Sequence, residues 1–373
     1  MSEDLPEPDR IEGAPHPRDT LRLFGQGAAE SAFLSAFNGG RMHHAWMLTG
    51  PRGVGKATLA WRIARFLLAT PDDGSGLFGA APAPATLDVS VDHPVARRIH
   101  AGSEPRLFHL RRAWDEKEKR LKTVISVDEV RKLKNFFALS AADGGRRVVI
   151  VDSADELNAN AANALLKVLE EPPAGAVLLL VCHRPSDLLP TIRSRCRTLQ
   201  LSTLEAQDIA AAMTAAGSEP LDPAALTALA GGSVGEAIRL SNLDGVTVYG
   251  DLVSLFSGIP RFDRPAARAL AESAAGRTAE ARFDLILGLF DLFLARLART
   301  GLTGAPQPEA ASGESALLAR LSPHDRAARA WADLHQSLGA RARHGRDVNL
   351  DPALLILDMV LKVDETAQRI SAR

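Results

Sequence analysis

The residues best suited to chemistry in this sequence form a glycine-rich loop near its N-terminus. Residues 50–56 read GPRGVGK, which matches the first seven positions of a Walker A phosphate-binding loop. Glycines let backbone N–H groups converge on phosphate oxygens, and the lysine neutralises the terminal phosphates of a nucleotide. The expected nucleotide-binding residues are Gly50, Pro51, Arg52, Gly53, Val54, Gly55, Lys56, Ala57, Thr58 and Asp152.

The eighth position of the loop departs from the Walker A pattern. A Ser or Thr hydroxyl at this position binds Mg²⁺, whereas this chain has Ala57. Thr58 follows one residue later, and one helical step turns its side chain about 100° away from the site. Lys56 and the loop amides remain, so weak or metal-independent binding of ATP stays open. The simpler alternative is a glycine turn that only begins a helix.

The elements around the loop fit a phosphate-binding context. An apolar run at 45–49 predicts a buried strand before the loop, and a helix from 56 to about 68 follows it. Further apolar runs at 148–151, 177–181 and 198–201 alternate with helical patterns, which predicts a mostly parallel, doubly wound sheet. We predict a sheet domain at 1–202, a small helical domain at 203–244 and a helical C-terminal domain at 245–373. Residues 71–86 resemble an irregular insertion, and 114–122 a solvated turn.

A second candidate site residue ends the strand RVVIVD. Asp152 stands where a Walker B aspartate would hold a metal-bound water, although capping the next turn is the commoner role of an isolated Asp. In an active ATPase with a Walker B strand, a glutamate follows this aspartate and polarises the attacking water, whereas this chain has Ser153. Asp155 and Glu156 belong to the following turn, so we expect their side chains to point elsewhere.

Two further motifs resemble a known family. Residues 163–173 read NALLKVLEEPP and are similar to the ALLKxLEEPP signature of bacterial DNA polymerase III clamp-loader subunits, and 192–196 (IRSRC) resemble their SRC motif. The resemblance extends from about residue 23 to 239, and more weakly beyond. It implies an α/β plus all-α protein: a AAA+ P-loop domain, a helical lid and a helical collar. It also implies a pentameric ring with gamma/tau motor and delta subunits, which acts on the sliding clamp and primed DNA.

The SRC motif implies a role for Arg195. In the family this arginine reaches into a neighbouring subunit's nucleotide site as an arginine finger in trans. A guanidinium keeps its charge and presents forked donors to phosphate oxygens. Arg193, Arg195 and Arg197 alternate, so an extended backbone would place all three on one side. The alternative is a plain basic edge that solvates a strand.

Four substitutions separate this chain from the family's active motors. They are Ala57, Ser153, the pair Cys182-His183 at a sensor threonine position, and Gly235 at the sensor-2 arginine position. Together they leave little stabilisation of a phosphoryl-transfer transition state. The pattern resembles the delta-prime type, so we expect a stator without ATPase activity of its own. The alternatives are an active AAA+ motor or helicase, a P-loop kinase, and a structural adaptor in which Arg195 has no role.

Composition narrows the remaining possibilities. The formal net charge is −1, so contact with DNA would be local or shared with partner subunits. No cysteine lies in 70–105, and His93, His100 and His109 are too scattered for zinc, so we expect no metal site. The longest apolar stretch, 285–297, is too short to span a bilayer, and a cytoplasmic protein is expected. The apolar face of that helix predicts either a core within its domain or packing between ring subunits: Phe283, Ile286, Leu287, Phe290, Phe293, Leu294 and Leu297.

Overall fold

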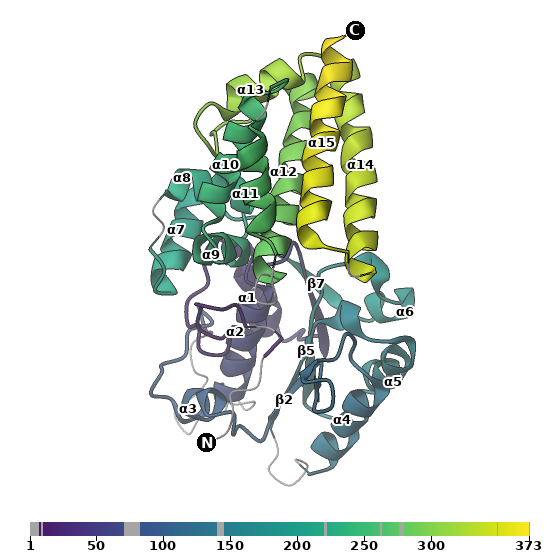
Figure 1. Ribbon diagram of the computed structural model, residues 1–373. Coiled ribbons are helices and arrows are strands. Elements are labelled where there is room, and N and C mark those ends of the chain that lie inside the picture. Colours follow the sequence, from purple (N-terminus) through teal and green to yellow (C-terminus); the bar gives the residue numbers. More distant parts are fainter. Residues whose placement is uncertain are drawn as a thin grey trace. The chain divides into compact units, whose positions relative to one another are not determined.

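The computed structural model describes residues 7–8, 10–70, 83–139, 145–219, 222–261, 263–275, 280–348 and 350–372. The chain divides into two compact units (Figure 1). The first comprises Met1–Ser218 with Gly232–Gly235, and the second Glu219–Gly231 with Glu236–Arg373. The division into three domains stays a prediction, and most of the expected insertion at 71–86 lies outside the described residues.

A five-stranded parallel sheet forms the centre of the first unit. Its strands are β1 (Ala45–Thr49), β2 (Leu107–Arg111), β5 (Arg147–Asp152), β6 (Ala176–Val181) and β7 (Arg197–Gln200), in the order β2-β5-β6-β1-β7. The predicted parallel sheet is thus confirmed. β2 was not predicted, and the expected turn at 114–122 is a short hairpin of β3 (Trp114–Asp115) and β4 (Arg120–Leu121).

Helices cover both faces of the sheet. In the first unit they are α1 (Gly27–Asn38), α2 (Lys56–Ala69), α3 (Pro94–His100), α4 (Val127–Leu139), α5 (Ala159–Glu170), α6 (Pro190–Arg193) and α7 (Ala206–Ala215), with 3-10 turns η2 (Ala154–Glu156) and η3 (Pro185–Asp187). α1 and α2 lie on one side and α4 and α5 on the other (Figure 1). Val149 and Val151 of β5 pack in the cluster that contains Leu165 and Leu169 of α5. The neighbouring β5 residues Val148 and Ile150 are also fully buried, which explains why this strand is apolar at consecutive positions.

The second unit is helical, as predicted. It contains α8 (Pro223–Ala230), most of α9 (Val234–Asn242), α10 (Gly245–Ser257), α11 (Arg264–Glu272), α12 (Glu280–Thr303), α13 (Glu314–Leu321), α14 (Asp325–Asp347) and α15 (Pro352–Ser371). α12 packs against α10, α13 and α14. Six of the seven apolar residues of its predicted face are buried there: Phe283, Ile286, Phe290, Phe293, Leu294 and Leu297. This face therefore forms a core within the unit, and packing of the C-terminal region against ring partners stays a prediction.

A buried ion pair joins three helices of the second unit. Glu314 is fully buried and receives hydrogen bonds from Tyr249 Oη at 2.6 Å and from Arg296 Nε at 2.6 Å. Arg296 Nη2 donates to the other carboxylate oxygen at 3.0 Å, and the Ala310 N–H donates to the same atom at 2.7 Å. A buried charge is tolerated when its lone pairs are satisfied in this way, so the cluster fixes α10, α12 and α13 to one another.

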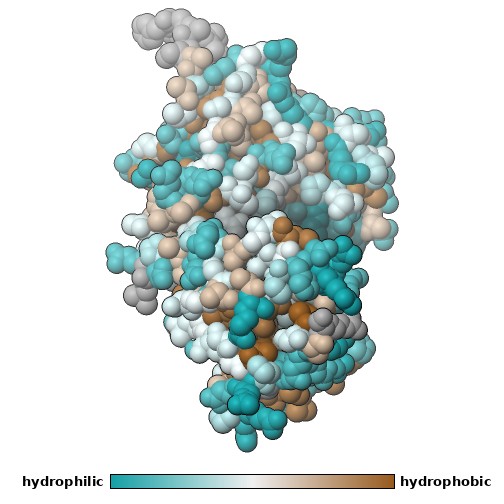
Figure 2. Space-filling model, turned by 90° about the horizontal axis from the view of Figure 1, so that it is seen from above, coloured by the Kyte–Doolittle hydropathy of each residue, from teal (hydrophilic) through white to brown (hydrophobic). Residues whose placement is uncertain are grey.

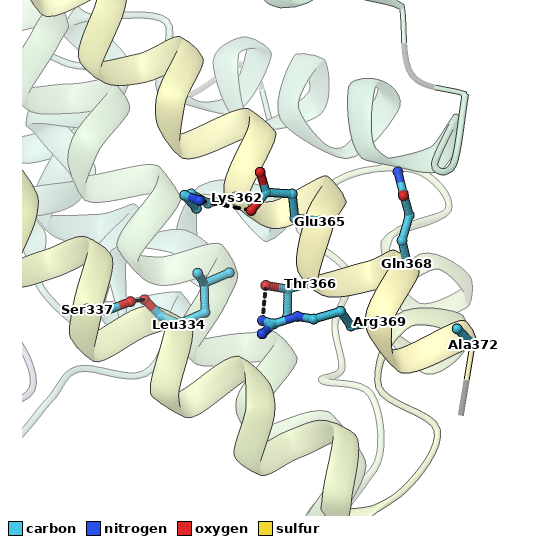
Figure 3. Close-up of a pocket in the computed structure, with 8 residues that line it drawn as sticks. All are labelled: Leu334, Ser337, Lys362, Glu365, Thr366, Gln368, Arg369 and Ala372. Carbon is cyan, nitrogen blue, oxygen red and sulfur yellow. Dashed lines mark hydrogen bonds and ion pairs between the residues drawn. The ribbon is translucent and has the colours of Figure 1, made fainter.

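The surface shows hydrophobic residues mostly in small groups among hydrophilic ones on the face drawn in Figure 2. A cavity of about 630 Å³ lies between α14 and α15 (Figure 3). Two pairs of its lining side chains bond to each other, Lys362 with Glu365 and Arg369 with Thr366. Since these polar groups are already paired, and none belongs to the predicted site, the cavity is not a candidate for the chemistry above.

Candidate functional site

The glycine-rich loop has the conformation that its sequence requires. It connects β1 to α2, and Gly50, Gly53 and Gly55 have φ values of 138°, 72° and 98°. A Cβ atom at Gly50 would overlap the carbonyl oxygen of Leu201. Only glycine combines this φ with so close an approach of two backbones. The strand–loop–helix context is therefore present, and binding of a nucleotide by these residues stays a prediction.

Lys56 is turned inward onto its own loop. Only 3% of this residue is exposed, and Nζ donates to the Gly50 carbonyl at 2.6 Å and to the carbonyl of Pro51. Burial lowers the pKa of Lys56 to about 8, and the charges of Asp155 and Asp152 oppose that shift. To reach a phosphate, the ammonium group would have to give up its bonds to the loop carbonyls.

Residues 232–235 lie directly against the tip of the loop. The Gly235 N–H donates to the Gly53 carbonyl at 3.1 Å, and a Cβ at Gly53 would overlap Ser233 Oγ. At the predicted sensor-2 position, a Cβ on Gly235 would come within 2.7 Å of Ile11 Cδ1. An arginine at 235 would therefore require the Ile11 side chain to shift, and its Cβ would also lie 3.0 Å from the Gly53 Cα. Because Gly235 has no side chain, residues 232–235 can pack closely against the tip of the loop.

Ser153 follows Asp152 in the chain and contacts both Asp152 and His183. Ser153 Oγ donates to Asp152 Oδ1 at 3.1 Å and lies 2.9 Å from His183 Nε2. Burial lowers the pKa of His183 to about 4, and the nearby Lys56 charge adds to the effect. At neutral pH the imidazole is therefore uncharged. The pair thus consists of a buried hydroxyl group and a partly buried, neutral ring, and neither group is an anionic base.

The expectation that Asp155 and Glu156 point elsewhere is wrong. The Asp155 side chain is fully buried, and its Oδ1 accepts a hydrogen bond from the backbone N–H of His183 at 2.8 Å. Among the nearby charges, that of Asp155 raises the pKa of Lys56 the most. Glu156 pairs with Arg52 at 3.7 Å and with Arg112 at 2.8 Å. The reason is the 3-10 turn η2, which follows the strand and does not continue its direction. These carboxylates balance the loop's cations, a role that spacing alone did not reveal.

The three alternating arginines do not lie on one extended backbone, so the condition for placing them on one side is not met. α6 ends at Arg193, the chain turns through 194–196, and the strand begins only at Arg197. Arg197 stacks over the ring of Trp46, with its guanidinium carbon 5.1 Å from the ring centre. Arg195 pairs with Glu170, with 2.9 Å between Nη2 and Oε1, and its side chain remains 37% exposed.

The three histidines considered as metal ligands each have a separate local role. His93 caps α3, His100 pairs with Asp19 at 2.6 Å, and His109 packs edge-on against Trp61. Burial raises the pKa of both Cys182 and Cys196 to about 12. Within the described part of the chain, no three His, Cys, Asp or Glu side chains are grouped so that they could hold a metal ion. No described helix is long and apolar enough to cross a membrane.

Sequence reasoning missed several residues that the structure brings to the candidate site. Ile11 and Leu23 approach the loop from the N-terminal segment, and no local motif marks them. The contact of Arg52 with Glu156 depends on tertiary structure. Glu170 could have been identified from the sequence, because a carboxylate in the last turn of a helix is unfavourable and indicates a nearby cation.

Comparisons with known sequences agree with this description of the first unit. The sequence model of the family described as DNA polymerase III, delta subunit, matches residues 25–205. The DNA polymerase III subunit delta' of Pseudomonas aeruginosa is 36% identical over 251 residues, which is 65% of this chain and 70% of that protein. The subunit delta' of Escherichia coli K12 is 32% identical over 44% of each protein. The chain thus spans less than half of that second relative.

A likeness to solved structures has also been found. A DNA polymerase III gamma subunit-related protein from Thermotoga maritima matches with 17% sequence identity and a TM-score of 0.41. The match covers 90% of this chain and 99% of that protein.

Proposed function

Because the chain belongs to the family of DNA polymerase III delta-prime subunits, we propose that it is a stator of a clamp loader. In this role it lends Arg195 to the ATPase site of a neighbouring subunit and does not hydrolyse ATP in its own site. Its relatives also include proteins named DNA polymerase III subunits gamma and tau, which supports such subunits as partners. The proposed setting is a cytoplasmic pentameric ring with gamma/tau and delta subunits that loads a sliding clamp onto primed DNA.

The observation that carries this proposal is the state of the Arg195 guanidinium. It lies at the surface of the first unit and uses Nη1 and Nη2 for the Thr191 carbonyl and Glu170. Other N–H groups of its fork remain for an external acceptor. An arginine supplied across an interface typically accelerates phosphoryl transfer about 10³- to 10⁵-fold, because it stabilises charge on the transferring group.

The chain's own loop supports the second half of the proposal. Ala57 has no metal-binding hydroxyl, Ser153 has no carboxylate, and Gly235 has no cationic side chain. Lys56 is held by the loop carbonyls, and residues 232–235 cover the loop's tip. Hydrolysis needs the metal, the oriented water and the charge stabilisation together, so these losses reinforce one another. Binding of ATP by this loop is proposed to be weak and independent of Mg²⁺.

The test is steady-state ATP hydrolysis by the partner gamma/tau and delta subunits, with and without this chain, in the presence of clamp and primed DNA. Addition of the wild-type chain is expected to raise the rate strongly, and Arg195→Ala to abolish the increase. Arg193→Ala is the matched control, since this exposed arginine lies at the end of α6 and should leave the rate unchanged. Full stimulation by Arg195→Ala would refute the proposal and favour a structural adaptor.

A further inference from the structure

Two neighbouring helices hold the Arg195 side chain. Nη2 lies 2.9 Å from Glu170 Oε1, and Nη1 donates to the Thr191 carbonyl at 3.0 Å. Glu170 is the last residue of α5, Thr191 belongs to α6, and the two helices lie side by side (Figure 1). The Arg195 side chain is 37% exposed and that of Glu170 is 47% exposed. The guanidinium is thus held by two hydrogen-bonding partners while the side chain remains partly exposed.

The residues on either side of Arg195 restrain its backbone. Ser194 Oγ donates to the same Thr191 carbonyl at 3.1 Å, which closes the end of α6. The Cys196 side chain packs against the apolar core under α5 and α6. Burial raises the pKa of its thiol to about 12, so the group stays uncharged at neutral pH. Of the three residues of this turn, only Arg195 carries a charge to the surface.

The position of Glu170 is unfavourable for the helix that carries it. α5 ends at Glu170, and Glu171 with Pro172 and Pro173 follows. The C-terminal end of a helix carries partial negative charge, so a carboxylate there is destabilising and a cation is stabilising. The Arg195 guanidinium pairs with this carboxylate and so offsets its unfavourable position. The pairing therefore gives a physical reason for an acidic residue where the helix alone would disfavour one.

We propose that Glu170 is a positioning residue that orients the Arg195 guanidinium for the phosphates of a neighbouring subunit's nucleotide. The inference rests on the proposed function of Arg195. A long side chain loses rotamer freedom when it docks at an interface, and the ion pair removes part of that loss before docking. Glu170 would not touch the nucleotide. It acts through Arg195.

The test compares Glu170→Ala, Glu170→Gln and Glu171→Ala in the full chain, mixed with gamma/tau and delta subunits, clamp and primed DNA. Glu170→Ala is expected to lower the stimulated kcat about two- to fivefold with KM for ATP unchanged, the range typical of half-exposed ion pairs. Glu170→Gln should lose less, because its amide oxygen still accepts a hydrogen bond. Glu171→Ala, one residue away, should match the wild type. The effect should shrink as added salt screens the pair.

Parallel measurement of Arg195→Ala separates failure of this inference from failure of the proposed function. If Arg195→Ala stimulates ATP hydrolysis as much as the wild type does, both the proposed function and this inference are refuted. If Arg195→Ala is inactive but Glu170→Ala equals Glu171→Ala, only the positioning role is refuted. A higher rate with Glu170→Ala would also refute it, because the carboxylate would then restrain the finger. Gel filtration of each mixture checks assembly, and Glu170→Gln serves if Glu170→Ala assembles poorly.

Discussion

Removal of the Glu314 carboxylate should destabilise the second unit severely. Glu314→Ala would leave the Arg296 guanidinium, which is only 6% exposed, without its ionic partner. It would also remove the acceptor for the Tyr249 hydroxyl and the Ala310 N–H. Breaking a buried pair on one side typically costs about 3–5 kcal/mol, because the remaining charge stays in an apolar environment. This is a large share of the roughly 5–15 kcal/mol by which a typical protein is stable.

The assay is equilibrium unfolding in urea, followed by circular dichroism, with Tyr249→Phe as a graded comparison. Loss of the single hydrogen bond in Tyr249→Phe should cost about 1.5–3 kcal/mol, the range for bonds to charged groups. Glu314→Gln should fall between the two other variants, since it keeps the shape and part of the hydrogen bonding. If Glu314→Ala unfolded at the urea concentration of the wild type, the carboxylate would not be buried and paired as described, and the reasoning would be wrong.

Two further predictions concern the first unit. The folded pKa of His183, about 4, lies below the ordinary value of 6.5, so the unfolded chain binds more protons between those pH values. Stability should therefore fall as pH drops from about 6.5 to about 4, and urea titrations should show a weaker dependence in His183→Gln. Gly50→Ala should lower the thermal midpoint, because it adds a clash with the Leu201 carbonyl to a strained φ. Gly40→Ala is the control, with φ of 64° but open space around the new Cβ, and a midpoint as low as that of Gly50→Ala would contradict the clash.

The sheet could be predicted from sequence because its central strands are apolar without interruption. Runs such as 148–151 and 177–181 correspond closely to β5 and β6, which are buried on both faces. β2 escaped prediction because its residues are only partly buried, apart from Leu110, so its apolar pattern is weak. The glycine loop was also predictable, since its φ values and close backbone contacts exclude most other residues.

The candidate site could be predicted only in part from the sequence, because many of its contacts join residues that are distant in the chain. The spacing of Arg193, Arg195 and Arg197 suggested one face, but Pro190 begins a helical turn that breaks the alternation. The position of Asp155 was predicted wrongly for a similar reason, because a 3-10 turn brings its charge close enough to act on Lys56. Motif spacing indicates which residues could act. Whether a carboxylate faces a cation depends on turns that spacing does not describe.

The central proposal is that this chain lends Arg195 to a neighbouring subunit and does not hydrolyse ATP itself. Its most direct test is ATP hydrolysis by the purified chain alone, with and without Mg²⁺. The expected result is turnover near background under both conditions, because the metal hydroxyl and the water-activating carboxylate are missing at positions 57 and 153. Magnesium-dependent turnover at a rate typical of loader motors, abolished by Lys56→Ala, would contradict the account. Such a result would place active chemistry in this chain's own loop.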